Sequence, residues 1–402
     1  MAAELLPMMS PDYIDYPEKY WQKLRESDPL YWSKEFNFWV VTRYEDVENF
    51  LKRPEDFSSS SGPGGGLRSS DDTTAEDVVG FLPMIQNDPP EHTRLRSIFA
   101  RSFTSRRIAR LETQVREIAD QLISELQEKY SKGVGIDLYK DFASPLPVAV
   151  IAKLLGIPLE YYERLQFWND ALGIGAGGSY TETQRIKATT EMNETLSEII
   201  NAKRSNPEDD LISSLVKLAD DEGDQLKANE LLGFCKLLWI AGNETTTNLI
   251  TNASVVLQGQ PELIEKLQNN KELIPQFVEE ALRYVGPVNG LFRRVTRDLE
   301  YKGKKFKEND NVWIMFASAN RDESHFENSD SFVVERHPND HLALGKGVHF
   351  CMGAALARLE AQIAFEYLVD VLPRFQLKPE EGVRIPVPVL RGWLKLPMIR
   401  KN

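Results

Sequence analysis

The chain has little cysteine and no long apolar run. Only two cysteines, Cys235 and Cys351, occur among its 402 residues, which excludes a disulfide framework and a four-thiolate zinc site built from this chain alone. No stretch approaches the about 18 uncharged apolar residues that a membrane-spanning helix needs. The first ten residues lack the basic and apolar regions of a secretory signal. We therefore expect a soluble, cytoplasmic protein without a membrane partner.

Positive charge is also scarce. The chain carries 48 Lys and Arg against 61 Asp and Glu, a formal net charge of −13. This balance argues against nucleic acid or an anionic membrane as the main partner, because both attract basic surfaces. With 42% hydrophobic and 27% charged residues, the composition excludes a disordered chain. The length is sufficient to bury a large core.

Hydrophobic periodicity divides the chain into a large helical part and a smaller β-rich part. The helical pattern covers about 88–285 and 354–372. The strand-like runs come from three separate segments, about 28–57, 286–318 and 383–398. We interpret residues 1–402 as a single, mainly α domain. A linker is the alternative interpretation of the Ser/Gly-rich segment 58–72, but it would leave too few residues for a stable N-terminal domain, so we expect a loop.

A glycine-rich turn contains Cys351. The segment Gly345-Lys-Gly-Val-His-Phe-Cys-Met-Gly353 directly precedes an Ala/Leu-rich helical stretch that begins at residue 354. Backbone N–H groups of such a turn and the N-terminus of a helix both favour negative charge on the sulfur. A thiolate in this position is a metal ligand or a nucleophile. An inert core cysteine is the alternative, but the glycines of the turn argue against it.

This turn resembles the haem-binding loop of the cytochrome P-450 family. The resemblance implies that Cys351 is the axial iron ligand and that the cofactor is haem b (iron protoporphyrin IX). Three further residues of the turn would bind the cofactor: Gly345, His349 and Gly353. Leu344 stands where the family usually has phenylalanine, which implies altered redox tuning at the iron rather than altered ligation.

The helical stretch 231–257 contains the sequence Ala241-Gly-Asn-Glu-Thr245. Taken alone, it predicts a buried helix whose threonine hydroxyls bond to carbonyls four residues earlier. In the family, the matching helix crosses the haem, and its small residues make room for dioxygen. The resemblance implies that Ala241 adjoins the cofactor and that Glu244 and Thr245 are the catalytic residues that relay protons.

Basic residues match the positions at which the family binds the two haem carboxylates, which need cationic or hydrogen-bonding partners. His92 and Arg96 lie in the sequence Asp88-Pro-Pro-Glu-His-Thr-Arg-Leu-Arg96, and Arg293 precedes an expected strand. With His349, they make a set of four. The resemblance therefore implies that these side chains hold the haem propionates.

Glu280 and Arg283 lie three residues apart on one face of a predicted helix. A pair at this spacing is usually a weak surface interaction. The resemblance implies instead the family's buried Glu-x-x-Arg pair, with Arg336 as a third partner, which fixes the core behind the cysteine loop.

The matching motifs run from Tyr13 to Leu396, so the resemblance implies the cytochrome P-450 fold for nearly the whole chain. The sequence around Glu244 is most similar to soluble bacterial members that oxidise fatty acids, steroids and terpenoids. We therefore predict a haem-thiolate monooxygenase that uses O2 and two electrons to hydroxylate an apolar small molecule. A peroxide-driven peroxygenase, a haem-dependent isomerase and a non-catalytic haem-binding protein are the alternatives, and the Glu244–Thr245 pair argues against them.

The source of electrons and the substrate pocket complete the expectation. No Gly-x-Gly-x-x-Gly fingerprint on a βαβ unit is present. Electrons should therefore come from a separate ferredoxin or flavodoxin-type partner with its reductase. Six apolar residues are predicted to line the substrate pocket: Leu82, Leu237, Ala241, Leu291, Val389 and Leu390. A cluster of basic residues suggests an acidic redox partner, with a solvated helix face as the alternative: Arg94, Arg101, Arg106, Arg107, Arg110 and Lys346.

Overall fold

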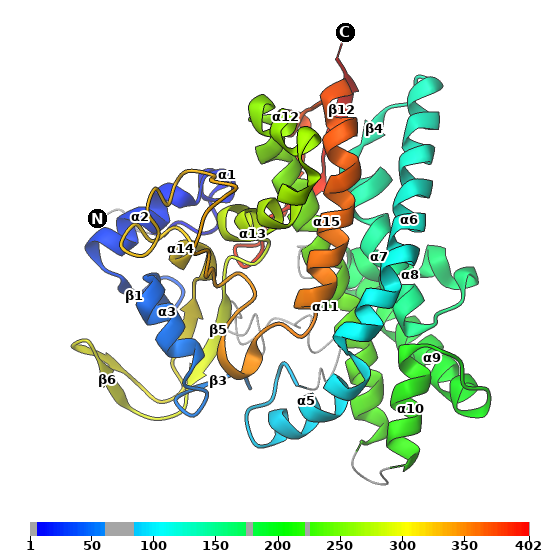
Figure 1. The fold of residues 1–402 in the computed structure, drawn as a ribbon. Helices are drawn as coiled ribbons and strands as arrows, with labels where there is room; N and C mark the ends of the chain where they lie inside the picture. The colour runs from blue at the N-terminus through cyan, green and yellow to red at the C-terminus, as the bar shows by residue number, and fades with distance from the viewer. Residues whose placement is uncertain (1–5, 61–83, 174–179, 222–225, 402) are drawn as a thin grey trace.

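The structure, a computed structural model, describes residues 6–60, 84–173, 180–221 and 226–401. A β-rich part, which includes the N-terminal segment, lies beside a larger helical part (Figure 1). Most of the Ser/Gly-rich segment 58–72 and the predicted pocket residue Leu82 lie outside the described residues.

One five-stranded sheet unites segments that are far apart in the sequence. Its strands, in spatial order, are β1 (Leu30–Ser33), β2 (Phe38–Val41), β8 (Asn311–Ile314), β5 (Leu291–Val295) and β3 (Phe57–Ser58). The pairing of β2 with β8 is parallel, and the other three pairings are antiparallel. All four residues of β2 are buried, as its unbroken apolar sequence Phe-Trp-Val-Val requires of a central strand.

Three smaller sheets complete the β-rich structure. They pair β6 (Leu299–Tyr301) with β7 (Lys304–Phe306), β10 (Val383–Arg384) with β11 (Trp393–Lys395), and β12 (Pro397–Arg400) with both β4 (Ile136–Asp137) and β9 (Phe375–Leu377). Strands β4 and β9 lie outside the segments predicted to be β-rich. Each pairs with β12 through only two or three residues, too few to produce a recognisable alternation of apolar and polar residues in the sequence.

Helices make up most of the described chain. Before the long central helix they are α1 (Pro11–Asp15), α2 (Glu18–Ser27), α3 (Tyr44–Leu51), α5 (Glu91–Ser102), α6 (Ser105–Ser131), α7 (Pro145–Leu155), α8 (Tyr162–Leu172), α9 (Glu182–Ser205) and α10 (Leu211–Asp221). From the central helix onward they are α11 (Ala228–Gln258), α12 (Pro261–Asn269), α13 (Ile274–Val285), α14 (Phe316–Ala319) and α15 (Ala354–Val371). The mainly α architecture with smaller sheets confirms the predicted fold class.

Helix α11 organises the helical core. It packs against α7, α13 and α15, and much of its surface is buried (Figure 1). Gly242 allows the contact with α7 to be close, because a Cβ at this position would lie 2.8 Å from Ile151 Cδ1. Among the residues that the structure describes, no helix is both long enough and apolar enough to cross a bilayer.

Candidate active site

The Cys351 turn has a conformation that only its glycines permit easily. Gly345 and Gly347 both have positive φ angles, 72° and 71°. A Cβ at Gly347 would lie 2.6 Å from the carbonyl oxygen of Leu51, so the turn is pressed against the end of α3. The Cys351 amide donates to the Leu344 carbonyl at 2.9 Å, which fixes the cysteine three residues before α15 begins.

Burial and local charge act in opposite directions on the Cys351 thiol. Burial raises its pKa, whereas the Gly353 amide and the guanidinium groups of Arg96 and Arg358 lower it. The sequence predicted that the amides and the helix would favour the thiolate, but in the protein alone burial has the larger effect. A coordinated metal ion would reverse this balance, because a coordinating thiol loses its proton.

Four basic side chains gather close to this turn. The rings of His92 and His349 lie 4.2 Å apart between centroids. Burial, with the charges of Arg293, His92 and Arg96, lowers the pKa of His349 to about 3. Arg293 is buried, which lowers the pKa of its guanidinium to about 10. Arg96 donates to the Phe350 carbonyl at 2.7 Å, next to Cys351. The structure therefore brings together the four residues that were predicted to hold the propionates.

This basic cluster is incompletely paired. Both ring nitrogens of His92 are buried, and neither has a hydrogen-bond partner among the described residues. Asp88 partly offsets the positive charge, since it raises the pKa of both His92 and Arg293. Buried donors without acceptors are costly, so the cluster suits an additional anionic group. The two carboxylates of haem meet this requirement.

Sequence reasoning missed the residues that support His349. The Ser59 hydroxyl lies 3.0 Å from His349 Nε2, and the Ser59 amide donates to Asp88 Oδ1 at 2.9 Å. Ser58 also donates to Asp88. The only hint in the sequence was that Asp88 lies four residues before His92. The contact between Ser59 and His349 joins positions 290 residues apart, so no local pattern predicts it.

Ala241 and Thr245 mark a face of α11 that the protein leaves open. Ala241 is exposed and Thr245 is half-buried, although residues 246–254 of the same helix are buried. The Thr245 hydroxyl donates to the Ala241 carbonyl at 2.7 Å, and Thr251 makes the same kind of bond two turns later. The back-bonding expected from the sequence alone is therefore present, and the catalytic role of Thr245 stays a prediction.

The Glu244 side chain lies toward α8. A Cβ at Gly173, just after α8, would lie 3.2 Å from Glu244 Oε1. Burial and the negative charges of Asp170 and Glu244 together raise the pKa of Tyr139. The carboxyl group thus lies in a partly buried polar surrounding, adjacent along the helix to Thr245.

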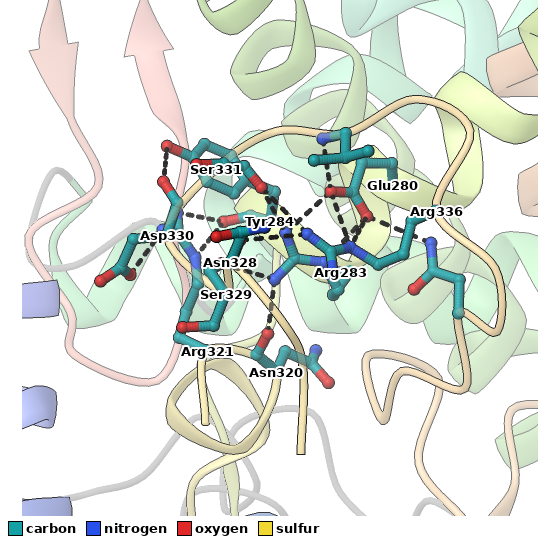
Figure 2. Close-up of polar contacts among 12 residues, drawn as sticks. Glu280, Arg283, Tyr284, Asn320, Arg321, Asn328, Ser329, Asp330, Ser331 and Arg336 are labelled. Atoms are coloured by element: carbon teal, nitrogen blue, oxygen red, sulfur yellow. Dashed lines mark hydrogen bonds and ion pairs between the residues drawn. The ribbon is translucent and has the colours of Figure 1, made fainter. Parts of the chain in front are cut away.

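Glu280, Arg283 and Arg336 form one buried network (Figure 2). Arg283 donates twice to the Glu280 carboxylate, at 2.7 and 2.8 Å, and both side chains are fully buried. Its remaining donors reach the carbonyls of Asn320, Ser329 and Ser331, each at 2.8 Å. Arg336 donates to Glu280 at 3.2 Å. The network connects α13 to the irregular segment that precedes the cysteine turn.

The family can now be assigned. The cytochrome P450 family model matches residues 179–399. The cytochrome P450 YjiB of Bacillus subtilis is 38% identical over 367 residues, which cover 90% of this chain and 88% of that protein. The chain belongs to the cytochrome P450 family. PikC of Streptomyces venezuelae, a cytochrome P450 monooxygenase, is 36% identical over 366 residues, covering 90% of this chain and 84% of that protein.

A solved structure supports the same assignment. The structure of CYP109E1 from Bacillus megaterium in complex with testosterone has a TM-score of 0.84 and 36% identity, and the match covers 96% of this chain and 98% of that chain. Cytochromes P450 bind haem b and are monooxygenases, and the incompletely paired basic cluster beside Cys351 fits that cofactor.

The predicted pocket residues of this P450 lie in different apolar clusters. Leu237 belongs to the helical core. Val389 and Leu390 are buried beside the five-stranded sheet, and the half-buried Leu291 packs on a third cluster. Only Ala241 among the described members is exposed. Membership of these clusters does not test whether the residues line one cavity, so the pocket stays a prediction.

The predicted basic surface of the P450 is partly neutralised. Arg94 is paired with Glu91 and Glu230, and Lys346 donates to Glu48 at 2.9 Å. Arg107 donates to the Ser214 hydroxyl at 2.6 Å. Three members have exposed side chains on α5 and α6: Arg101, Arg106 and Arg110.

A second charged cluster near Cys351 was not predicted. Arg358 on α15 and Glu279 on α13 form a bidentate pair, and His341 contacts the same carboxylate. Arg358 and Glu279 lie 79 residues apart. No local spacing rule connects such positions, so the sequence carried no signal for the pair.

Proposed function

We propose that this P450 hydroxylates an apolar small molecule of the fatty acid, steroid or terpenoid type. It would use O2 and two electrons from a ferredoxin or flavodoxin-type partner with its reductase. One observation carries the proposal. A cysteine at the start of α15 lies beside a cluster of four basic side chains whose buried donors are not all satisfied.

The residues that would hold haem b follow from this arrangement. Cys351 would be the axial ligand, and four side chains would bind the propionates: His92, Arg96, Arg293 and His349. The small residues Ala241, Gly345 and Gly353 would lie against the ring. When held by a thiolate, haem supplies the iron chemistry that activates dioxygen.

Glu244 and Thr245 would hold and move protons on the open face of α11. The Thr245 hydroxyl, at 2.7 Å from the Ala241 carbonyl, can donate a proton and receive one. The partly buried Glu244 carboxyl would return a proton to it. This pair favours a dioxygen-dependent reaction over peroxide-driven turnover, isomerisation or simple haem binding.

The substrate class rests on the apolar character of the predicted pocket and on related proteins. CYP109E1 has been solved with testosterone and with corticosterone. P450BioI has been solved with hexadec-9Z-enoic acid linked to an acyl carrier protein. Steroids and fatty acyl chains are both largely apolar, which fits the apolar residues that were predicted to line the pocket.

The redox partner would approach the exposed arginines of α5 and α6. Arg101, Arg106 and Arg110 give an acidic protein a local basic surface, which would steer an acidic ferredoxin or flavodoxin. Charge reversal at Arg101 and Arg110 should slow reduction and weaken its salt dependence. Unchanged rates at low ionic strength would contradict docking at this surface.

A spectral titration tests the substrate class. Testosterone, hexadec-9-enoic acid and a terpene are added separately to the haem-loaded protein, and the spin-state change of the Soret band is followed. We expect saturable binding of at least one of the three compounds, and its oxidation when O2, NADH, ferredoxin and reductase are supplied. Product formed with hydrogen peroxide but not with the reductase system would favour a peroxygenase instead.

A further inference from the structure

Glu279 and Arg358 form an ion pair between α13 and α15, the helix that follows the cysteine turn. Arg358 lies on α15, two turns after Cys351, and Glu279 lies on α13 next to Glu280. The guanidinium donates from Nε to Glu279 Oε1 at 2.6 Å and from a terminal nitrogen to Oε2 at 2.9 Å. Both side chains are about one-third exposed, so the pair is held in place without being desolvated completely.

His341 fixes the carboxylate of this pair. Its Nδ1 accepts a hydrogen bond from the Ala343 amide at 3.3 Å. With Nδ1 as the acceptor, Nε2 is the ring nitrogen that donates to Glu279 Oε2, at 3.2 Å. His341 is buried at the beginning of the segment that leads into the cysteine turn. The geometry of the pair is thus coupled to the backbone on which Cys351 lies.

Arg358 lies close to the cysteine turn. It is in the second turn of α15, which begins three residues after Cys351, and its charge is one of those that lower the pKa of the Cys351 thiol. Burial alone would raise the pKa of Glu279, but the bonds from His341 and Arg358 lower it to about 2. Glu279 is therefore ionised at neutral pH and partly cancels the charge of Arg358.

We propose that Glu279 and Arg358 are positioning residues whose opposed charges set the reduction potential of a haem held by Cys351. Reduction adds one electron to the iron, so a nearby positive charge stabilises the reduced state and a negative charge destabilises it. Arg358 raises the potential, and Glu279 limits that increase. The inference rests on the proposed ligation by Cys351.

The experiment is a spectroelectrochemical titration of the haem-loaded protein. Glu279→Gln should raise the potential and Arg358→Gln should lower it. Each should change the equilibrium constant for one-electron reduction by up to about tenfold, or about 59 mV. The double variant should return close to the wild-type value, because both charges are then absent. Arg358→Lys should keep most of the wild-type potential, since it keeps the charge but loses the bidentate geometry.

The Arg116–Glu366 pair is a matched control. Glu366 lies on α15 like Arg358, and its side chain is also about one-third exposed. Glu366→Gln removes a charge from the same helix but farther from Cys351, so the potential should not change. Equal shifts for Glu366→Gln and Glu279→Gln would overturn the proposal, because the effect would then be a general one of net charge.

The two proposals fail in different ways. If Cys351 is not the ligand, the wild-type ferrous–CO complex lacks the red-shifted Soret band of thiolate ligation. If that band is normal but the single variants leave the potential unchanged, or shift it in the same direction, only the charge-pair proposal is wrong.

Discussion

Two groups of charged side chains, the network around Glu280 and the basic cluster around His92, differ in how completely they are paired. In the network, every donor of Arg283 reaches Glu280 or a carbonyl (Figure 2). In the cluster around His92 and Arg293, both ring nitrogens of His92 lack a partner among the described residues, and burial together with the arginine charges lowers the pKa of both His92 and His349. The first group is satisfied by the protein itself, whereas the second fits an additional anionic ligand.

The same contrast separates stability from function. Replacement of a paired group should reduce folding stability. Replacement of a group that would bind haem or act on the substrate should change haem binding or turnover, while the fold is kept.

Glu280→Gln should have the largest effect on folding. The substitution leaves Arg283 buried without its counter-charge, which costs about 3–5 kcal/mol in unfolding free energy. Urea denaturation of the haem-free protein measures the loss. Glu335→Gln breaks the exposed pair with Lys266 and should cost less than about 1 kcal/mol. Similar costs for the two variants would remove the distinction between a buried structural network and surface pairs.

Thr245→Ala should have a large effect on turnover and a small one on stability. Among the described residues, the hydroxyl bonds to a carbonyl of its own helix, so its removal disturbs little packing. Product per electron should fall about tenfold or more, and hydrogen peroxide per electron should rise, because proton delivery is lost. NADH consumption, peroxide and product are measured together.

Two companion variants sharpen this result. Thr245→Ser should restore coupling, since it keeps the hydroxyl. Thr251→Ala deletes an equivalent back-bond deeper in the core and should leave coupling unchanged. A fully coupled Thr245→Ala enzyme would show that its protons arrive by another route.

Arg293→Met should act in opposite directions on the haem-free and haem-loaded proteins. It replaces a cation whose burial is unfavourable with an apolar side chain, so the haem-free protein should gain about 1–2 kcal/mol in unfolding free energy. Haem should be lost faster, because a propionate partner is absent. Urea denaturation and haem transfer to a scavenging protein measure the two effects. A loss of stability in the haem-free variant would mean that Arg293 is already satisfied by the protein.

Glu279→Gln should have the smallest effect on folding, and the effect should depend on pH. The folded-state pKa of Glu279, about 2, lies below the ordinary value of 4.5. Its contribution is therefore present above about pH 4.5 and is lost as the pH falls toward 2. Because the group is partly exposed, we expect less than about 1 kcal/mol. The difference in stability between wild type and variant should shrink over this interval, and a constant difference would contradict the assignment.

The sequence predicted features that depend on neighbours in the chain. Glycine spacing around Cys351, small residues before Thr245 and the i, i+3 pair Glu280–Arg283 all leave local signals. Contacts between distant segments leave none. Ser59 meets His349 and Arg358 meets Glu279 only because the fold brings their segments together. The pocket was not predictable in the same way, because apolar residues serve a core and a substrate site equally well.

Ligation by Cys351 is the central claim, and the ferrous–CO spectrum tests it directly. Wild type should show the red-shifted Soret band of a thiolate-ligated haem. Cys351→His should keep some haem, because the basic cluster still holds the propionates, but it should lose that band. Cys235→Ala, which changes the other cysteine in the core, should keep it. An unchanged spectrum in Cys351→His would contradict the account.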